Sequence, residues 1–263
     1  MRILVCMKQI LDPDVPARDF RIDESRNEAE RAGANLVPNI FCENALETAL
    51  QLRDAASGSV TALSFGTEEA EDVVRKALAM TVDEAALVTR PEGPAPDALT
   101  VARVLAAAAR KLGDFDVVMV GRESGDWGVG QTGGLLAEEL GLPMVALVDR
   151  AEPVDGGLTL RRQTDYGFDD VEAHGAVLAT ITNSKGNVPR IPKTRDVMKS
   201  YRKPLTTWSV DELGVAADET VAEVVELSVP DKHITCEFVE GDSLDERVDA
   251  FARKIADVMG AVG

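Results

Sequence analysis

Short apolar runs alternate with longer amphipathic segments through the first two-thirds of the chain, and this alternation limits the possible folds more than any other feature. The runs are apolar on both faces, as expected of strands in a parallel sheet that helices cover on both sides. They are Ile3–Met7, Val60–Ser64, Ala85–Val88, Val117–Val120 and Val145–Val148, with helical patterns between them at Cys42–Ala56, Glu68–Ala79, Ala98–Lys111 and Gly134–Leu140. This order predicts an α/β fold with a doubly wound, mostly parallel sheet, in which ligands bind beyond the carboxyl ends of the strands.

Two regions interrupt or extend this pattern. The stretch from Asp12 to Pro38 is polar and rich in turn residues, which predicts a hairpin or an excursion over the edge of the sheet. After Pro143, further extended runs predict extra β-strands added to the sheet. These runs are Leu158–Arg162, Asp170–Ala173 and Val177–Thr182.

The composition is that of a globular protein with a strong excess of acidic residues. Of the 263 residues, 45% are hydrophobic and 28% are charged, which suits one large domain, or one domain with an appendage. The formal net charge is −18. Nucleic-acid binders need cationic surface and anionic membranes repel acidic proteins, so this charge argues against both partners.

The sequence predicts no insertion into a membrane. Its apolar runs are shorter than the roughly 20 residues that a spanning helix needs. The opening segment Met1–Lys8 has too few apolar residues before its lysine for the core of a signal peptide. We therefore expect a cytoplasmic protein.

The cysteines and histidines predict neither a disulfide framework nor a metal site. Cys6, Cys42 and Cys236 are far apart, and His174 and His233 are the only histidines. Cys6 and Cys42 fit small core residues. Neither histidine accompanies a nucleophile motif, so the sequence indicates binding without a catalytic residue.

A glycine-rich stretch after the fourth predicted strand, residues 121–134 (the Gly-rich loop below), is the clearest sign of a ligand site. It reads Gly121-Arg122-Glu123-Ser124-Gly125-Asp126-Trp127-Gly128-Val129-Gly130-Gln131-Thr132-Gly133-Gly134 and opens a helix. Small residues let backbone N–H groups approach an anion, the Thr132 hydroxyl can donate, and a helix N-terminus is partially positive. The loop is neither a Walker motif nor GxGxxG. The alternative is an ordinary surface loop.

A second segment, Val37–Glu43, precedes the first predicted helix. Asn39 is placed as an N-cap, with Cys42 where a capping box would have Glu or Gln. The segment is either a turn with a cap or a helix start that points at the same ligand edge as the Gly-rich loop.

Residues 183–203, called the basic segment below, stand out from the acidic chain. They hold seven cations and one acid, a balance of +6: Lys185, Arg190, Lys193, Arg195, Lys199, Arg202 and Lys203 against Asp196. Such a run is either a solvated face or a docking surface. Apolar residues mixed into it favour docking, in which charge steers the encounter and apolar groups supply contact.

Taken together, these motifs make the chain resemble the β subunit of electron-transfer flavoprotein over roughly residues 2–215. Each motif is weak alone, and their common order is what carries the resemblance. The motifs are Ile3-Leu4-Val5-Cys6-Met7-Lys8-Gln9, Pro38-Asn39-Ile40-Phe41-Cys42-Glu43-Asn44-Ala45-Leu46-Glu47, Ser64-Phe65-Gly66, Arg75-Lys76-Ala77-Leu78-Ala79-Met80, Gln131-Thr132-Gly133, and Pro189-Arg190 followed by Val197-Met198-Lys199.

The resemblance implies an adenine-nucleotide-hydrolase-like fold, a non-enzymatic electron carrier, and a heterodimer whose α subunit holds the redox-active FAD. Family β subunits bind AMP or, in electron-bifurcating members, a second FAD. By position, that nucleotide would contact Cys6, the residues from Asn39 through Ile40 and Phe41 to Cys42, and Phe65. The loop would hold its phosphates through Gly121, Arg122, Glu123, Ser124, Gly125, Asp126, Gly130, Gln131 and Thr132.

The Gly-rich loop departs from both family patterns. Gly125-Asp126 is similar to the bifurcating type, whereas Gln131-Thr132-Gly133 is similar to the ordinary type, and Trp127 fits neither. Thr132 stands where the bifurcating type prefers Val, which favours AMP. Phe41 matches a position that approaches the α-subunit flavin, while a second aromatic position is here Pro13.

The resemblance also implies partners for the basic segment and the C-terminus. The family uses this region to recognise flavin-dependent, acyl-CoA-type dehydrogenases, and electrons pass on to an acceptor such as a quinone reductase. The implied docking residues are Arg190, Ile191, Thr194, Arg195, Val197, Met198 and Lys199, with Thr194 where a Leu anchor is usual.

We therefore expect three parts: a nucleotide-binding α/β domain at 1–182, a recognition loop and connection at 183–215, and a C-terminal arm at 216–263. The arm ends in an amphipathic pattern at Leu244–Met259 and is expected to pack on the partner subunit. Two other functions stay open: a bifurcating subunit whose own FAD oxidises NADH, and a stand-alone ATP-binding stress-type protein.

Overall fold

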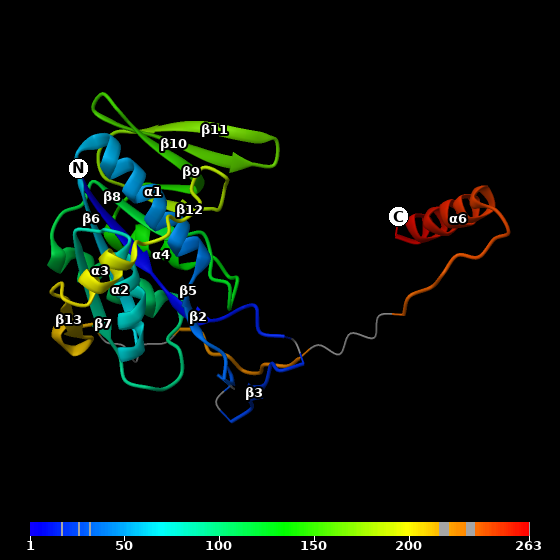
Figure 1. The fold of residues 1–263 in the computed structure, drawn as a ribbon, viewed down its shortest axis with the longest axis horizontal. Coiled ribbons are helices and arrows are strands. Elements are labelled where there is room, and N and C mark those ends of the chain that lie inside the picture. The colour runs from blue at the N-terminus through cyan, green and yellow to red at the C-terminus, as the bar shows by residue number, and fades with distance from the viewer. Residues whose placement is uncertain (17, 26, 32, 216–220, 230–234, 263) are drawn as a thin grey trace. The chain divides into compact units, whose positions relative to one another are not determined.

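The computed structural model describes residues 1–262 apart from 17, 26, 32, 216–220 and 230–234. It divides into two units, Met1–Leu227 and Ser228–Gly263. The first unit holds the sheet and the helices that cover it (Figure 1), and each unit is considered by itself below.

A nine-stranded sheet in the order β11-β10-β9-β12-β8-β1-β6-β7-β13 forms the framework of the first unit. Strands β9, β12, β8, β1, β6, β7 and β13 pair in parallel, and β10 pairs antiparallel with β9 and β11. The bounds are β1 Arg2–Met7, β6 Ser59–Gly66, β7 Glu84–Thr89, β8 Val117–Gly121, β9 Met144–Val154, β10 Gly157–Thr164, β11 Gly167–Ala173, β12 Val177–Ile181 and β13 Thr206–Ser209. The predicted α/β class and mostly parallel sheet are confirmed.

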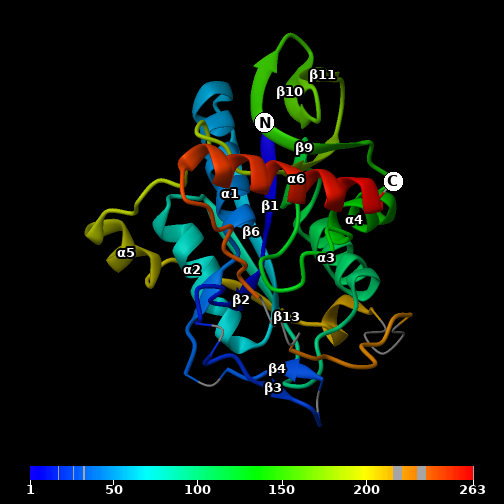
Figure 2. The ribbon, with the colours of Figure 1, turned by 90° about the vertical axis from the view of Figure 1, so that its right-hand side faces the viewer.

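Helices cover both faces of the sheet (Figures 1 and 2). Helices α1 (Ile40–Ala56) and α2 (Glu71–Ala79, after a 3-10 turn at Glu68–Ala70) pack on one face. Helices α3 (Ala98–Leu112) and α4 (Thr132–Leu140) pack on the other. All four coincide with predicted helical patterns.

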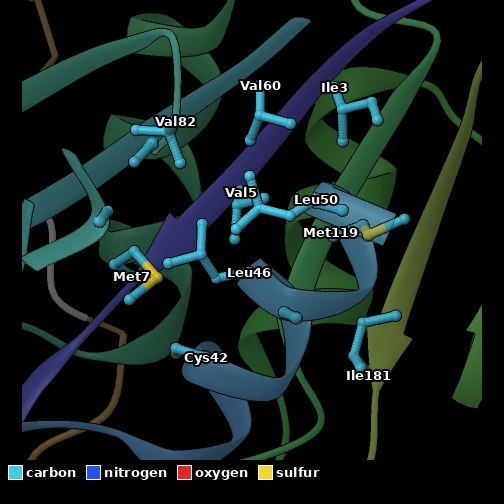
Figure 3. Close-up of a cluster of buried hydrophobic side chains, with 14 of the residues drawn as sticks. Ile3, Val5, Met7, Cys42, Leu46, Leu50, Val60, Val82, Met119 and Ile181 are labelled. Atoms are coloured by element: carbon cyan, nitrogen blue, oxygen red, sulfur yellow. The ribbon is translucent and has the colours of Figure 1, made fainter. Parts of the chain in front are cut away.

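The side chains of β1 alternate between these two layers. Ile3, Val5 and Met7 belong to the cluster under α1 and α2, whereas Leu4 and Cys6 belong to the cluster under α3 and α4. All five are nearly or fully buried, at 6% exposure or less. Figure 3 shows the α1 side, where Cys42, Leu46 and Leu50 lie against Val5 and Met7. Burial on both faces explains why β1 is apolar throughout.

The predicted excursion between Asp12 and Pro38 consists of two short antiparallel ladders. Strand β2 (Gln9–Leu11) pairs with β5 (Leu36–Pro38), and β3 (Ile22–Asp23) pairs with β4 (Glu28–Ala29). A single residue separates β2 from β1, and a single residue separates β5 from α1, so this ladder stands at the carboxyl end of the central strand.

The region expected to be a loop and connection contains regular structure. Helix α5 spans Thr194–Ser200, and β13 pairs in parallel with β7 at the edge of the sheet, followed by a 3-10 turn at Asp211–Leu213. Residues 183–215 therefore contribute a strand to the same sheet as residues 1–182. We find no apolar alternation in Thr206–Ser209 that would have predicted that strand.

The second unit contains α6, Leu244–Val262, which confirms the predicted C-terminal helix. Leu244, Val248, Phe251, Ile255 and Val258 recur at helical spacing and are 42–75% exposed. Among the described residues of this unit, none forms a core beneath the apolar face of α6. Among the helices of the described residues, none combines the length and the apolar character needed to cross a membrane.

Asp97 joins the start of α3 to the extended segment after β13. Its carboxylate accepts hydrogen bonds from the backbone N–H groups of Thr100 (2.8 Å), Val221 (2.8 Å) and Ala222 (3.1 Å). Burial acts to raise the pKa of Asp97, but these hydrogen bonds outweigh it and hold the pKa below its ordinary value. The bonds therefore stabilise the fold above the unfolded-state pKa, and this contribution is lost as the pH falls through the folded-state pKa.

We predict that Asp97→Ala lowers the free energy of unfolding by about 1 kcal/mol at neutral pH, as for the loss of an N-cap. The difference from wild type should shrink in acid, because both proteins then lack the charged carboxylate. Urea unfolding at neutral and acidic pH measures it, with the exposed Asp114→Ala as a control. A difference that is the same at both pH values would contradict the assignment.

Candidate functional site at the carboxyl ends of the strands

The strand order of the sheet reverses at β1, which makes the carboxyl end of β1 a topological switch point. From β1 it adds β6 and β7 on one side, and then returns to add β8 on the other side of β1. Open α/β sheets bind ligands at such a switch point, beyond the carboxyl ends of the strands. Here those ends are followed by Lys8 and by the Gly-rich loop, and α1 begins beside them at Ile40.

Asn39 connects the three segments that meet at this edge. Its side chain is 1% exposed. Its backbone N–H donates to the carbonyl of Lys8 (2.9 Å), its Nδ2 donates to the carbonyl of Glu123 (2.8 Å), and its Oδ1 accepts from the N–H of Gly125 (3.0 Å). Asn39 does occupy the predicted N-cap position of α1, but its side chain makes no capping hydrogen bond. The amide instead holds the Gly-rich loop against the helix start.

Close packing explains two glycines of the loop. A Cβ on Gly121 would lie 2.9 Å from Cβ of Phe41, and one on Gly133 would lie 2.5 Å from Cγ2 of Thr180. Both distances are too short for real Cβ atoms. Glycine at these positions lets α1 and α4 approach the ends of β8 and β12.

The start of α4 offers free backbone donors. The first N–H groups of any helix lack an intrahelical acceptor. No side chain caps this helix, Gln131 is exposed and Thr132 is half-buried. Gly128 and Gly130, in the loop before it, have φ angles of +65° and +66°. This arrangement suits a bound anion, because the N–H groups and the helix dipole both favour negative charge.

Two cations lie at the base of the loop: Lys8 comes from the end of β1, and Arg122 belongs to the loop itself. Lys8, a single lysine that belongs to no phosphate-binding motif, has Nζ 2.8 Å from both carboxylate oxygens of Asp126 and 3.2 Å from Oγ of Ser124. Arg122 pairs with Glu123 (2.7 Å), and its guanidinium lies 4.5 Å from the centre of the Phe41 ring. The signal that could have revealed Lys8 is its position directly after the central strand.

The remaining predicted contact residues lie on both sides of the sheet at this edge. Cys6 and the half-buried Phe65 belong to the α3 and α4 side, and Cys42 belongs to the α1 side. Burial raises the pKa of both thiols, so Cys6 and Cys42 stay protonated. Ile40 is 48% exposed at the helix start. The two cysteines are therefore neutral core residues at the base of the site.

The donor set of this edge fits a polyanionic, flat ligand better than a metal ion. Among the described residues, no three His, Cys, Asp or Glu side chains gather as metal ligands. His233 lies outside the described residues. What the edge does provide is backbone N–H groups, hydroxyls, a lysine and an aromatic ring.

Within the basic segment, Arg190 is bound to α1. Its Nε and Nη2 lie 2.8 and 3.0 Å from the carboxylate of Glu47, which is 5% exposed, and its Nη1 lies 3.4 Å from Asp54. The hydrogen bond to Glu47 raises the pKa of Arg190 further above its ordinary value. Arg190, predicted as a docking residue, therefore fastens the segment to the core.

The other predicted docking residues lie on or beside α5 and face solvent. Ile191 is 91% exposed and Met198 is 63% exposed. Thr194, Arg195, Val197 and Lys199 are exposed too. Arg75 of α2 holds the end of α5 by donating to the carbonyls of Ser200 (2.8 Å) and Lys203 (2.7 Å). The structure thus presents cations and apolar side chains together on a short, anchored helix.

We predict that Asn39→Ala loosens the Gly-rich loop. The change leaves the Glu123 carbonyl and the Gly125 N–H without their partner, at a cost of about 1–3 kcal/mol in unfolding free energy. Amide hydrogen exchange at Gly125 should become faster, while exchange in β6 stays unchanged. Asn35→Ala, at an exposed position, is the control. Unaltered exchange at Gly125 would show that Asn39 does not hold the loop.

Comparisons with known proteins identify the family of the chain. A family model described as the electron transfer flavoprotein domain matches residues 28–213. The chain is 35% identical over 216 residues to the electron transfer flavoprotein subunit beta of Clostridium acetobutylicum, which covers 82% of this chain and 81% of the relative. It is 32% identical over 248 residues to that of Thermoanaerobacterium thermosaccharolyticum, covering 92% and 93%.

A third relative is the caffeyl-CoA reductase-Etf complex subunit CarD of Acetobacterium woodii, 30% identical over 83% of this chain and 82% of the relative. The resemblance inferred from short motifs is confirmed by these matches. The chain belongs to the electron transfer flavoprotein family and is one of its β subunits.

Proposed function

We propose that this chain pairs with an α subunit that holds the redox-active FAD, and that it binds AMP structurally at the carboxyl edge of its sheet. Electrons would arrive from a flavin-dependent, acyl-CoA-type dehydrogenase and leave to an acceptor such as a quinone reductase. The flavin supplies the electron chemistry, and this chain supplies binding, orientation and docking. The cytoplasmic location expected from the sequence stays a prediction.

The observation that carries the nucleotide proposal is the joining of Asn39 to the Gly-rich loop. It gathers the uncapped start of α4, Lys8, and the half-buried Phe41 and Phe65 at one sheet edge. Phosphate oxygens would accept from the α4 N–H groups and from Thr132, and a base would lie against an aromatic or apolar surface. No acid–base pair is needed, because the nucleotide would be held without being transformed.

The α-subunit interface is proposed to use two features. Phe41, stacked under Arg122 at 4.5 Å, would turn an aromatic ring toward the partner's flavin. The exposed apolar face of α6 would be covered by the α subunit, because a helix face of this kind is stable only when it is buried. Residues 216–263 would then be the arm that the sequence predicts.

A second candidate is a bifurcating subunit with its own FAD that oxidises NADH. The similarity to the subunit of a caffeyl-CoA reductase-Etf complex favours a reductase of a CoA ester as the partner in that case. Gly125-Asp126 in the loop is the local feature that this candidate shares. The two candidates differ in the nucleotide at the sheet edge.

The decisive experiment is to heat the purified complex of this chain with its α subunit and to identify the released nucleotides by mass. One FAD with one AMP per complex supports the first proposal, and two FAD support the second.

Thr132→Val should reduce the content of the site nucleotide, because a donor to its phosphate is lost, whereas Thr207→Val on β13 should not. Full nucleotide occupancy in the Thr132→Val variant would contradict the placement of the nucleotide phosphate at the start of α4.

For docking, we predict that the double change Arg195→Glu/Lys199→Glu slows electron transfer from the donor dehydrogenase by about tenfold or more at low salt, with a smaller effect at high salt. Nucleotide content should be unchanged, because both residues lie on α5 away from the sheet edge. Arg18→Glu/Arg150→Glu makes the same change in net charge outside the basic segment and serves as control. Equal rates in both variants would refute the docking role.

A further inference from the structure

Lys8 and Asp126 form an ion pair at the centre of the candidate site. Both carboxylate oxygens of Asp126 lie 2.8 Å from Nζ of Lys8, and Oγ of Ser124 lies 3.2 Å from the same nitrogen. The side chains are 42% and 26% exposed. The Lys8 ammonium therefore lies where the end of β1, the Gly-rich loop and solvent meet. In this structure it is paired with a carboxylate of the same chain.

Asp126 stands between the part of the loop that Asn39 holds and the exposed loop tip, in which the N–H of Gly128 donates to the carbonyl of Ser124 (2.9 Å). The residues before it are held, since Asn39 binds Glu123 and Gly125. The residues after it, Trp127 to Gln131, are all exposed. Gly128 and Gly130 are in the left-handed region there, which lets the loop tip change its path with little steric cost. The carboxylate of Asp126 can therefore leave Lys8 while the base of the loop stays in place.

A phosphate monoester is a better partner for this lysine than the carboxylate is. Both groups present two oxygens to the ammonium. The carboxylate carries a single negative charge, whereas the phosphate carries a charge of about −1.5 to −2 at neutral pH. A half-exposed lysine–carboxylate pair contributes little free energy, because water screens it and two side chains must be ordered. Exchange of one anion for the other at Lys8 is accordingly favourable.

We propose that Lys8 is the phosphate-binding cation of this site and that the side chain of Asp126, which the resemblance counts among the residues that hold the phosphates, is instead a built-in competitor that the phosphate of an adenylate displaces. This assignment rests on the proposed nucleotide function and adds a residue and a selectivity to it. Adenosine, which has no phosphate, leaves the Lys8–Asp126 pair intact. Binding of AMP breaks the pair and moves the loop tip that carries Trp127, whose backbone N–H now donates to Asp126 Oδ1 at 2.9 Å.

The test compares AMP with adenosine in four forms of the full chain in complex with its α subunit, after removal of bound nucleotide: wild type, Lys8→Gln, Asp126→Asn and the double variant. Calorimetry gives the dissociation constant for each ligand. Lys8→Gln should weaken AMP about tenfold, as for one lost charge-assisted contact, and leave adenosine unchanged. Asp126→Asn should bind AMP several-fold more tightly than wild type, because the competitor is gone.

The double variant should bind AMP as weakly as Lys8→Gln, since the competitor has no effect once the lysine is absent. Glu69→Gln, which removes a carboxylate from the exposed pair with Arg31, is the matched control and should leave both ligands unchanged. If Asp126→Asn binds AMP more weakly than wild type, or with equal affinity, Asp126 is no competitor and the proposal is wrong. Equal AMP affinity in Lys8→Gln and wild type would also overturn it.

Tryptophan fluorescence gives an independent readout. In a Trp208→Phe background Trp127 is the remaining tryptophan of this chain, so AMP but not adenosine should change its emission when Lys8 and Asp126 are both present. The same AMP-induced change should be missing in Lys8→Gln. An identical change with both ligands would refute displacement of the loop tip by phosphate. A complex that binds neither AMP nor a flavin nucleotide would instead refute the proposed function, and the two failures are thereby distinguished.

Discussion

The burial of α1 against β1 is the contact on which both candidate sites depend. Cys42, Ala45, Leu46, Ala49 and Leu50 are 5% exposed or less and pack on the cluster that contains Val5 and Met7 (Figure 3). Apolar burial of this kind is the main favourable term in folding, and close packing leaves the helix little freedom to shift. The start of α1 is thereby fixed beside the carboxyl ends of the strands, and other segments bind to the helix along its length.

Polar residues at the start of α1 and along it bind other segments of the chain and hold them in fixed positions. At its start, Asn39 holds the Gly-rich loop. One to two turns later, Asn44 donates to the carbonyl of Asn187 (2.9 Å) and Glu47 binds Arg190, so the segment leading to α5 is fastened there. Buried polar groups are costly unless they are paired, and these pairs therefore specify one position for each segment. A single helix in this way orients the proposed nucleotide site and the proposed docking helix.

Some elements were predictable because their environment is uniform along their length. Strand β1 is buried on both faces and helix α3 on one, so the first is an unbroken apolar run and the second shows a clear helical period in the sequence. Strand β13 has no such period: Thr206 and Thr207 are exposed at the edge of the sheet, and only pairing with β7 makes the segment a strand. The pairing of Arg190 was unpredictable for a similar reason, since its acidic partner on α1 is distant in sequence. Asn39 was placed correctly at the helix start, but its hydrogen bonds reach 84 to 86 residues along the chain.

The sequence by itself determined the class of the fold, the edge of the sheet at which glycines and a helix start gather, and the family, because periodicity and motif order are local properties that survive without coordinates. Only the tertiary structure decided which charges are paired and which side chains are exposed. It paired Lys8 with Asp126 and Arg190 with Glu47, and it left Ile191, Met198 and Lys199 exposed on and beside α5. The reason is physical: an ion pair depends on a separation of a few ångströms, and residues more than 100 positions apart acquire that separation only when the chain has folded.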